Sequence, residues 1–205
     1  MCGRYTVFTE DEIAELRAIL NEINERYKNT RLHAAMKTGE IAPTNVAPVV
    51  ASDGVHLMHW GIPKWDGKGV VINARSESAH EKSMFKQSLL TRRCVVPSTG
   101  FYEWSHTGPK IKYLCRMPGI PLLLMAGIYG LYANARGEKE EHYTILTTAA
   151  NADIAPIHDR MPVILQPSEQ SDWIHNPGAA TEILHRPGPG LTLSPVDGFA
   201  QGSLF

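Results

Sequence analysis

The sequence predicts an α+β fold in which a folded-over, barrel-like mixed β-sheet is flanked by helices. Strand-like runs follow one another closely along most of the chain, and helical patterns occur at their margins. No internal repeat, low-complexity tract or linker divides the 205 residues, a length that one domain accommodates. We therefore expect a single domain that spans residues 1–205.

The chain begins with a predicted strand and a predicted helix. Residues 3–8 have the pattern of a short strand, and Thr9 followed by Glu12 is a capping-box signature. Apolar residues then recur at helical spacing, which predicts an amphipathic helix over residues 10–27 whose apolar face packs on the core. The apolar residues are Ile13, Leu16, Leu20, Ile23 and Tyr27.

A β-hairpin is predicted next. Residues 48–52 and 55–60 are apolar runs on either side of Asp53-Gly54, a pair typical of tight hairpin turns. Trp60 lies inside the second run, so we expect it in the core. Eight further strands are expected at 69–74, 92–97, 100–105, 111–116, 121–130, 142–149, 161–165 and 191–195. Short helices are expected at 83–90, 167–175 and 178–185.

Composition is that of an ordinary soluble protein, with 43% hydrophobic and 20% charged residues. No apolar run approaches the roughly 18 residues that cross a bilayer, and the N-terminus lacks a secretory signal pattern. The three cysteines have no regular spacing, which favours a reducing compartment over a disulfide framework. We expect a cytoplasmic protein without a membrane partner, in the bacterial cytosol or nucleoid if prokaryotic, with Cys94 and Cys115 buried.

The net charge of −1 counts against a large nonspecific DNA-binding surface. Acidic residues are concentrated at Asp11, Glu12, Glu15 and within 138–141, which leaves room for a separate basic patch. Composition thus permits a nucleic-acid partner without predicting one.

Cys2 carries a distinctive chemistry if the initiator Met1 is removed. The residue then holds an α-amine, with an ordinary pKa of about 7.7–8.0, and a thiol with an ordinary pKa of about 8.5. An aldehyde suits this pair, because the amine forms an imine and the sulfur then closes a five-membered thiazolidine ring intramolecularly. Taken alone, a second-position cysteine is more often a small apolar residue.

An ordered set of segments resembles the SRAP family (SOS-response-associated peptidase, or abasic-site processing proteins). The segments span residues 1–165 in family order: Met1-Cys2-Gly3-Arg4-Tyr5, Ile41-Ala42-Pro43-Thr44-Asn45 with Pro48-Val49-Val50, Trp60-Gly61-Ile62-Pro63 with Trp65, Ile72-Asn73-Ala74-Arg75-Ser76-Glu77-Ser78, Cys94-Val95-Val96-Pro97, Gly100-Phe101-Tyr102-Glu103-Trp104, and Ile157-His158-Asp159-Arg160-Met161-Pro162. No single segment is decisive, but the ordered set is highly specific.

The resemblance implies that Cys2 forms a thiazolidine with the ring-opened sugar of an abasic site in single-stranded DNA. Glu103 matches a glutamate that moves protons near the α-amine, and its aromatic neighbours suggest a pKa raised by desolvation. His158 matches the group that protonates or deprotonates the sugar oxygen, a task suited to a histidine. Asn73 matches the residue that orients the cysteine or the sugar.

The resemblance also implies DNA contacts. Arg75 and Arg160 match phosphate-binding arginines, and Arg4 is a third candidate. Trp65 matches an aromatic on which a base stacks, a contact worth about 1–3 kcal/mol per base. Surface lysines extend the expected electrostatic track: Lys64, Lys68, Lys82 and Lys86. Many family members carry two adjacent tryptophans where this chain has Lys64-Trp65, and the tail after Pro195 is shorter and different here.

Two other functions remain open on the sequence. Cys2 matches the nucleophile of a cysteine peptidase, with its amine or His158 as base, although we expect any peptidase activity to be confined to removal of Met1. A noncovalent single-stranded nucleic-acid binder is the third reading. We expect no cofactor and a monomer. We also expect no metal, because the histidines and cysteines considered as ligands lack the spacing of a metal site. Those residues are His33, His56, His59, Cys94 and Cys115.

Overall fold

The computed structural model describes residues 2–7, 13–106, 108–134 and 136–196, and it confirms the α+β class. The helices are α1 (Ala14–Tyr27), α2 (Arg31–Ala35), α3 (Ser76–Ala79), α4 (Ser83–Thr91), α5 (Gln170–His175), α6 (Pro177–His185) and the 3₁₀ turn η1 (Pro167–Glu169). The strands are β1 (Arg4–Val7), β2 (Gly39–Ile41), β3 (Val46–Ala51), β4 (Gly54–Trp60), β5 (Ile62–Pro63), β6 (Val70–Val71), β7 (Asn73–Arg75), β8 (Arg93–Ser98), β9 (Gly100–Trp104), β10 (Lys112–Arg116), β11 (Leu123–Ala133), β12 (Lys139–Ala149), β13 (Arg160–Pro162), β14 (Ile164–Leu165) and β15 (Thr192–Pro195).

Five strands of the larger sheet close on themselves in the order β12-β4-β3-β8-β11, after which β11 pairs with β12 again. The pairs in this ring are antiparallel except for β12 and β4, which run parallel at His142–His59 and Tyr143–Trp60. Closure leaves no unpaired edge among these strands, which is the usual way for a β-sheet to protect its polar backbone. The barrel-like prediction is therefore confirmed.

A second sheet has the order β15-β10-β9-β1-β2, so that β1 is hydrogen-bonded on both sides. Its Tyr5 side chain joins this sheet to the ring: Tyr5 Oη lies 2.5 Å from Tyr143 Oη, and the Tyr5 ring meets the edge of Trp60 at 5.1 Å. Thr6 O also accepts a hydrogen bond from Thr99 N at 2.7 Å. These contacts fix the position of β1, and thereby of Cys2, relative to the ring.

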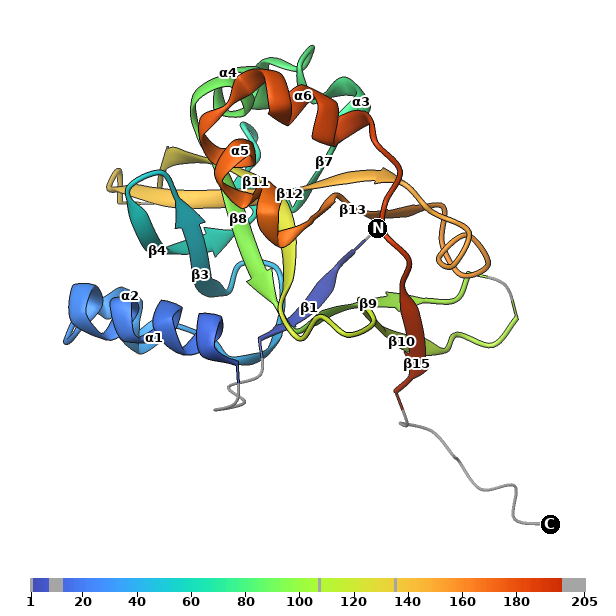
Figure 1. The fold of residues 1–205 in the computed structure, drawn as a ribbon. Helices are drawn as coiled ribbons and strands as arrows, with labels where there is room; N and C mark the ends of the chain where they lie inside the picture. Colours follow the sequence, from blue (N-terminus) through green and yellow to red (C-terminus); the bar gives the residue numbers. More distant parts are fainter. Residues whose placement is uncertain (1, 8–12, 107, 135, 197–205) are drawn as a thin grey trace.

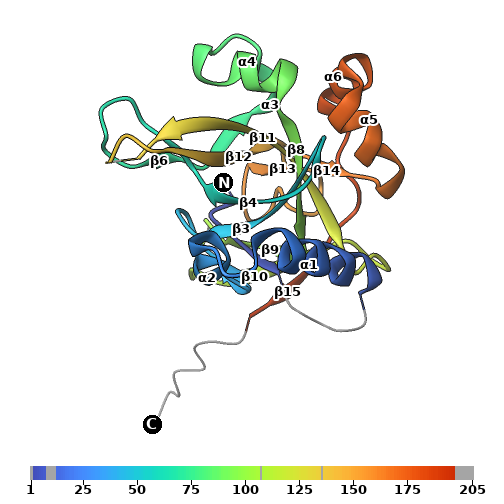
Figure 2. The same cartoon turned by 90° about the vertical axis from the view of Figure 1, so that its left-hand side faces the viewer.

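The helices cover two regions of the β structure (Figure 1). α1 and α2 lie beside the β3–β4 hairpin, and α3 to α6 gather at the opposite end of the ring. Figure 2 shows α4 and α6 on either side of α3 at the top of the molecule, with β6 on one side. Within the described residues, no helix is long and apolar enough to cross a membrane.

A continuous hydrophobic core contains residues from Cys2 to Leu191 and includes Trp60, which is fully buried as predicted. Cys94 and Cys115 are also fully buried and unpaired, again as predicted. The assignment of residues 1–205 to one domain stays a prediction.

Several element boundaries differ from those predicted. The described part of the first helix begins at Ala14, and its expected capping box lies outside the described residues. The hairpin turn consists of Ser52 and Asp53, because Gly54 already pairs with Ala51.

Two predicted strands are each divided in the structure. Residues 69–74 split into β6, which pairs with β5, and β7, which pairs with β12. Residues 161–165 split because β13 pairs with β12 and β14 with β11. Val163 bridges the two, donating to Leu146 O and accepting from Ala126 N, both at 2.8 Å.

Candidate active site

Cys2 lies two residues before β1 and is fully buried. Its Sγ is 3.4 Å from the Arg4 carbonyl oxygen. The β1–β9 register pairs Arg4 with Tyr102, which brings the start of β1 alongside the end of β9, where Glu103 lies. Burial raises the pKa of the Cys2 thiol well above its usual range, and the negative charge of Glu103 raises it further. The thiolate form is therefore disfavoured at neutral pH.

Glu103 is 3% exposed despite its charge. Its carboxylate lies in a buried position on β9. Burial raises the pKa of the Glu103 carboxyl, as its aromatic surroundings predicted. A carboxyl group with a raised pKa can hold and release a proton near neutral pH, which is the property required of an acid–base group.

His158 faces Glu103 from the loop that precedes β13, with Nε2 3.8 Å from Glu103 Oε1. His158 Nδ1 lies 2.9 Å from the backbone N–H of Arg160, a donor, and 2.9 Å from Asp159 Oδ1, an acceptor. Both neighbours hold the ring in place. A neutral ring with its proton on Nδ1, directed to Asp159, presents the Nε2 lone pair to Glu103.

His106 approaches the same pair from the segment after β9. Its ring meets the His158 ring edge-on, with the ring centroids 4.3 Å apart. Burial lowers the pKa of His158, and the neighbouring His106 acts in the same direction. His158 is therefore neutral at physiological pH. His106 itself is exposed, and its backbone N–H donates to Ile157 O at 3.2 Å, which joins the two loops.

Asn73 holds the backbone of the cysteine. It opens β7, which pairs in parallel with β12, and its Nδ2 donates to the Cys2 carbonyl oxygen at 2.9 Å. Asn73 Oδ1 is buried and has no hydrogen-bond partner among the described residues. A buried unpaired acceptor is costly, so this oxygen is suited to a donor on a bound ligand.

The structure thus brings together Cys2, Asn73, Glu103 and His158, the four residues predicted to carry the chemistry. They come from the segment before β1, the start of β7, the end of β9 and the loop before β13. His106 was not predicted. Its only sequence signal is its position three residues after Glu103, which matches no strand period.

The three predicted arginines have different surroundings. Arg75 is exposed at the end of β7. Arg4 Nε lies 3.3 Å from Glu40 Oε1, and Glu40 also binds Lys112. Arg160 is only 8% exposed, and its guanidinium makes a bidentate contact with Glu77 at 2.6 and 2.9 Å. A phosphate contact by Arg160 remains a prediction, but it requires sharing the guanidinium with Glu77.

Trp65 is 94% exposed in the loop between β5 and β6. That loop is closed by hydrogen bonds between Lys64 and Gly69 and between Gly67 and Lys64. A groove beside Trp65, about 630 Å³ in volume, is also lined by Arg92, Leu131 and Tyr132. An aromatic ring that projects into solvent is suited to stacking on a base. The predicted lysines are all exposed: Lys64, Lys68, Lys82 and Lys86.

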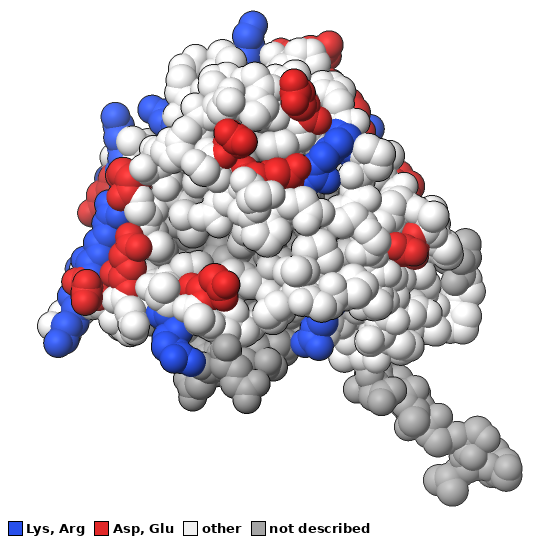
Figure 3. Space-filling view, viewed as in Figure 1, with Lys and Arg blue, Asp and Glu red and all other residues white. Residues whose placement is uncertain are grey.

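Charged side chains on the face shown in Figure 3 do not form a continuous basic patch. Blue and red atoms alternate along its left edge, over the β3–β4 hairpin and the neighbouring helices, and the centre is largely uncharged. This face therefore offers little to a nucleic-acid backbone.

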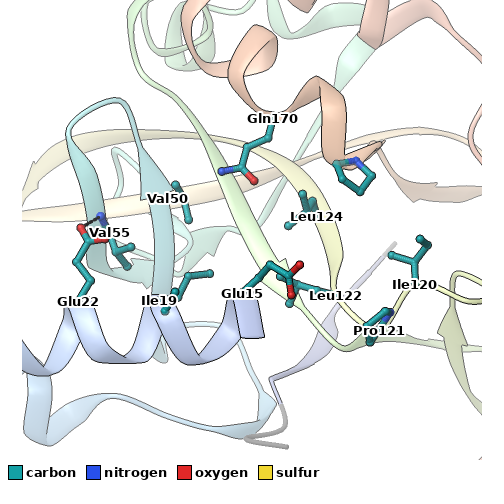
Figure 4. Close-up of a pocket in the computed structure, with 12 residues that line it drawn as sticks. Glu15, Ile19, Glu22, Val50, Val55, Ile120, Pro121, Leu122, Leu124 and Gln170 are labelled. Carbon is teal, nitrogen blue, oxygen red and sulfur yellow. Dashed lines mark hydrogen bonds between the residues drawn. The ribbon is translucent and has the colours of Figure 1, made fainter. Parts of the chain in front are cut away.

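An apolar hollow of about 560 Å³ lies elsewhere, between α1, the β3–β4 hairpin and β11 (Figure 4). Its walls include Ile19, Val50, Leu122 and Leu124, and none of the residues predicted to carry the chemistry lines it. The described residues that line it include no cysteine, serine, threonine or histidine, so this hollow offers neither the nucleophile nor the histidine that the predicted chemistry needs.

Comparison with known proteins identifies the fold and the family. The family model described as SOS response associated peptidase (SRAP) matches residues 1–198. The chain belongs to the SRAP family.

Relatives within this family carry informative names. The chain is 33% identical to "Abasic site processing protein YoqW" of Bacillus subtilis over 85% of its own length and 80% of that protein. It is 31% identical to "Abasic site processing protein YedK" of Escherichia coli over 85% and 79% of the two chains. A crystal structure of a Bacteroides thetaiotaomicron protein superposes with a TM-score of 0.77 at 25% identity, covering 96% of this SRAP chain and 92% of that one.

Proposed function

We propose that this SRAP protein processes abasic sites in single-stranded DNA by forming a covalent thiazolidine crosslink through Cys2. The crosslink shields the lesion, and the protein acts as a monomer in the cytosol. The observation that supports this most directly is the meeting of the start of β1 with a buried Glu103–His158 pair and with the Asn73 amide. The names of the relatives point to the same substrate class.

The reaction begins with removal of Met1, which frees the Cys2 α-amine. We assign this cleavage to the protein itself. Burial and the Glu103 charge keep the thiol protonated, so the amine, whose ordinary pKa is about 7.7–8.0, is the first nucleophile at neutral pH. The amine attacks C1′ of the open-chain sugar, whose carbonyl oxygen becomes a hydroxyl group.

Loss of that hydroxyl as water gives an imine, and the thiol then adds to the imine carbon to close the ring. We assign the proton transfers to Glu103 and His158, whose Oε1 and Nε2 atoms lie 3.8 Å apart: Glu103 takes the protons that the amine loses, and His158 Nε2 passes them on to the departing oxygen. Asn73 fixes the Cys2 carbonyl and thereby the direction of both nucleophiles. Slow reversal uses the same proton transfers in the opposite order. No step requires a metal or an organic cofactor.

The test combines the full-length protein with a single-stranded oligonucleotide that contains one abasic site. Intact mass spectrometry should show protein lacking Met1, and an adduct whose mass is the sum of protein and DNA minus one water. Cys2→Ala should abolish the adduct that survives SDS denaturation, whereas Cys94→Ala, a change at another buried cysteine, should retain it.

An adduct that persists in Cys2→Ala, or that forms with Met1 still attached, would overturn the proposal. Peptide substrates provide the contrast with a general peptidase, because turnover of peptides without a DNA adduct would favour that function instead.

A further inference from the structure

Glu103, His106 and His158 form a group with the donor set of a metal site. Each offers one ligand atom, and these atoms all lie within 4.8 Å of one another. The three come from β9, from the segment directly after it, and from the loop before β13, whose backbones are joined by the His106 N–H to Ile157 O hydrogen bond. The sequence had suggested no metal site, but that expectation considered other histidines and cysteines.

Two imidazole nitrogens and one carboxylate oxygen are a common ligand set for zinc, with a fourth position left for water or another ligand. Ligand atoms bound tetrahedrally at about 2.0–2.1 Å lie about 3.4 Å from one another. Glu103 Oε1 and His158 Nε2 are 3.8 Å apart, so a shift of a few tenths of an ångström brings them to that spacing. Imidazole donors exclude Mg²⁺ and Ca²⁺, which prefer oxygen ligands.

Burial differs within the group in a way that suits reversible binding. Glu103 is 3% and His158 6% exposed, so both are held in place by packing. His106 is exposed and follows the last strand residue of β9, so it can turn toward or away from the other two and gives a cation a route from solvent.

We propose that Glu103, His106 and His158 bind a divalent transition cation of the Zn²⁺ class, and that the bound cation inhibits the crosslinking reaction. The inhibition rests on the proposed function, because the cation occupies the Glu103 and His158 lone pairs that transfer protons there. The metal site itself does not rest on it. The cation acts as a reversible inhibitor that a chelator removes.

The binding test uses the full-length protein with Zn²⁺ in competition with a chromophoric chelator, and with Co²⁺ as a visible-light probe of tetrahedral coordination. His106→Phe retains an aromatic ring against His158 and removes the ligand nitrogen. His80→Phe alters another exposed histidine and is the matched control. Wild type and His80→Phe should bind one equivalent with the same affinity, and His106→Phe should bind it at least about tenfold more weakly. Equal affinity in all three proteins would overturn the site.

The inhibition test measures the ratio of crosslinking rates without and with one equivalent of Zn²⁺. Wild type and His80→Phe should lose most of their rate and regain it on addition of a chelator, whereas the ratio for His106→Phe should stay near one. Inhibition of His106→Phe equal to that of wild type would overturn the inhibitory role. If no protein crosslinks at all, the proposed function fails, and the binding test still decides the metal site.

Discussion

At the scale of single residues, the site contains a carboxyl group whose burial destabilises its charged form. Glu103 is almost fully buried, and burial raises the pKa of its carboxyl. A folded-state pKa above the unfolded value means that this group favours the folded state below its unfolded pKa, and that this contribution is lost as pH rises through the folded pKa. At neutral pH, Glu103 therefore lowers the stability of the fold in which it acts.

Glu103→Gln should raise the urea midpoint of unfolding at neutral pH and slow adduct formation by about 10²-fold or more. The gain in stability should vanish at about pH 3, below the unfolded Glu pKa of about 4.3, where wild-type Glu103 is protonated in both states. Unfolding curves at the two pH values and single-turnover crosslinking rates measure both effects. A variant less stable than wild type at neutral pH would contradict the assignment of a raised pKa.

The arginines allow a second residue-scale prediction. Arg75→Ala should weaken noncovalent binding of single-stranded DNA and reduce the slope of log K against log salt by about 0.7, with an unchanged unfolding midpoint. Arg160→Ala should destabilise the fold by about 1.5–3 kcal/mol, because it removes the buried guanidinium that hydrogen-bonds to Thr147 O and to Glu77. DNA affinity against salt and urea denaturation distinguish the two. A large loss of stability in Arg75→Ala would contradict the assignment.

Residue roles were predictable where one residue carries its own chemistry. The amine and thiol of Cys2 indicate a reaction with aldehydes by themselves, whereas the roles predicted for Cys2 and Glu103 came from the resemblance to the SRAP family. The engagement of Arg160 with Glu77 could not be predicted, because it depends on how β13 packs against α3. His106 was missed for the same reason: its importance comes from His158, far along the chain.

At the scale of elements, α1 and β12 together hold the tip of the β3–β4 hairpin. Glu22 Oε1 accepts from Val55 N at 2.7 Å, and Arg26 Nη1 donates to Val55 O at 3.1 Å. On the other side, His56 places Nδ1 2.9 Å from Glu141 and Nε2 2.9 Å from Asp53. Carboxylates at both ring nitrogens favour the charged imidazole. The hydrogen bond to Glu141 is the largest cause, and the pKa of His56 is raised.

A raised histidine pKa stabilises the fold below the unfolded pKa of about 6.5, and this contribution is lost as pH rises through the folded pKa. His56→Gln should therefore lower the urea midpoint more at about pH 6 than at about pH 9. His80→Gln, at an exposed position, is the control and should show no such difference. A deficit for His56→Gln that is the same at both pH values would show that His56 acts only through packing.

Elements were predictable where the local pattern is long. The first helix, predicted over residues 10–27 and described from Ala14 to Tyr27, and the hairpin were recovered because each has several turns or alternations of sequence behind it. The five-residue α2 and four-residue α3 are too short to show a period. Residues 161–165 are divided because Val163 hydrogen-bonds to β11 and β12 at the same time, and the sequence of the segment alone does not show these two partners.

At the scale of the whole molecule, closure of the ring requires β8, β11 and β12 to approach closely. Gly127 on β11 permits this: a Cβ at that position would lie 3.0 Å from Cys94 Sγ, 3.1 Å from Val96 Cγ2 and 3.3 Å from Thr144 O. A side chain there must push apart strands on either side of β11.

Gly127→Val should therefore destabilise the protein by about 1–3 kcal/mol through overpacking. Gly178→Ala, in α6 with only the Asn176 side chain nearby at 3.4 Å, is the contrasting change and should stabilise by up to about 1 kcal/mol. Urea denaturation measures both. A Gly127→Val variant as stable as wild type would contradict the close approach of these strands.

The class of fold and its barrel-like sheet were predictable from many short strands with helices at their margins, but the strand order that closes the ring was not. Closure depends on the parallel pairing of His142 and Tyr143 with His59 and Trp60, which are distant in sequence. Both segments look like ordinary strands, and nothing local specifies which edge each one meets.

The pairing of β1 with a strand on each side has a mechanical consequence. In the proposed crosslink, a DNA strand attached at Cys2 would pull on a chain segment that is hydrogen-bonded to β9 on one side and to β2 on the other. Tension along β1 loads both ladders in shear, so their bonds resist together, whereas an edge strand would unzip one bond at a time. An enzyme that moves along the DNA and collides with the adduct would therefore pull on a strand that is held on both sides.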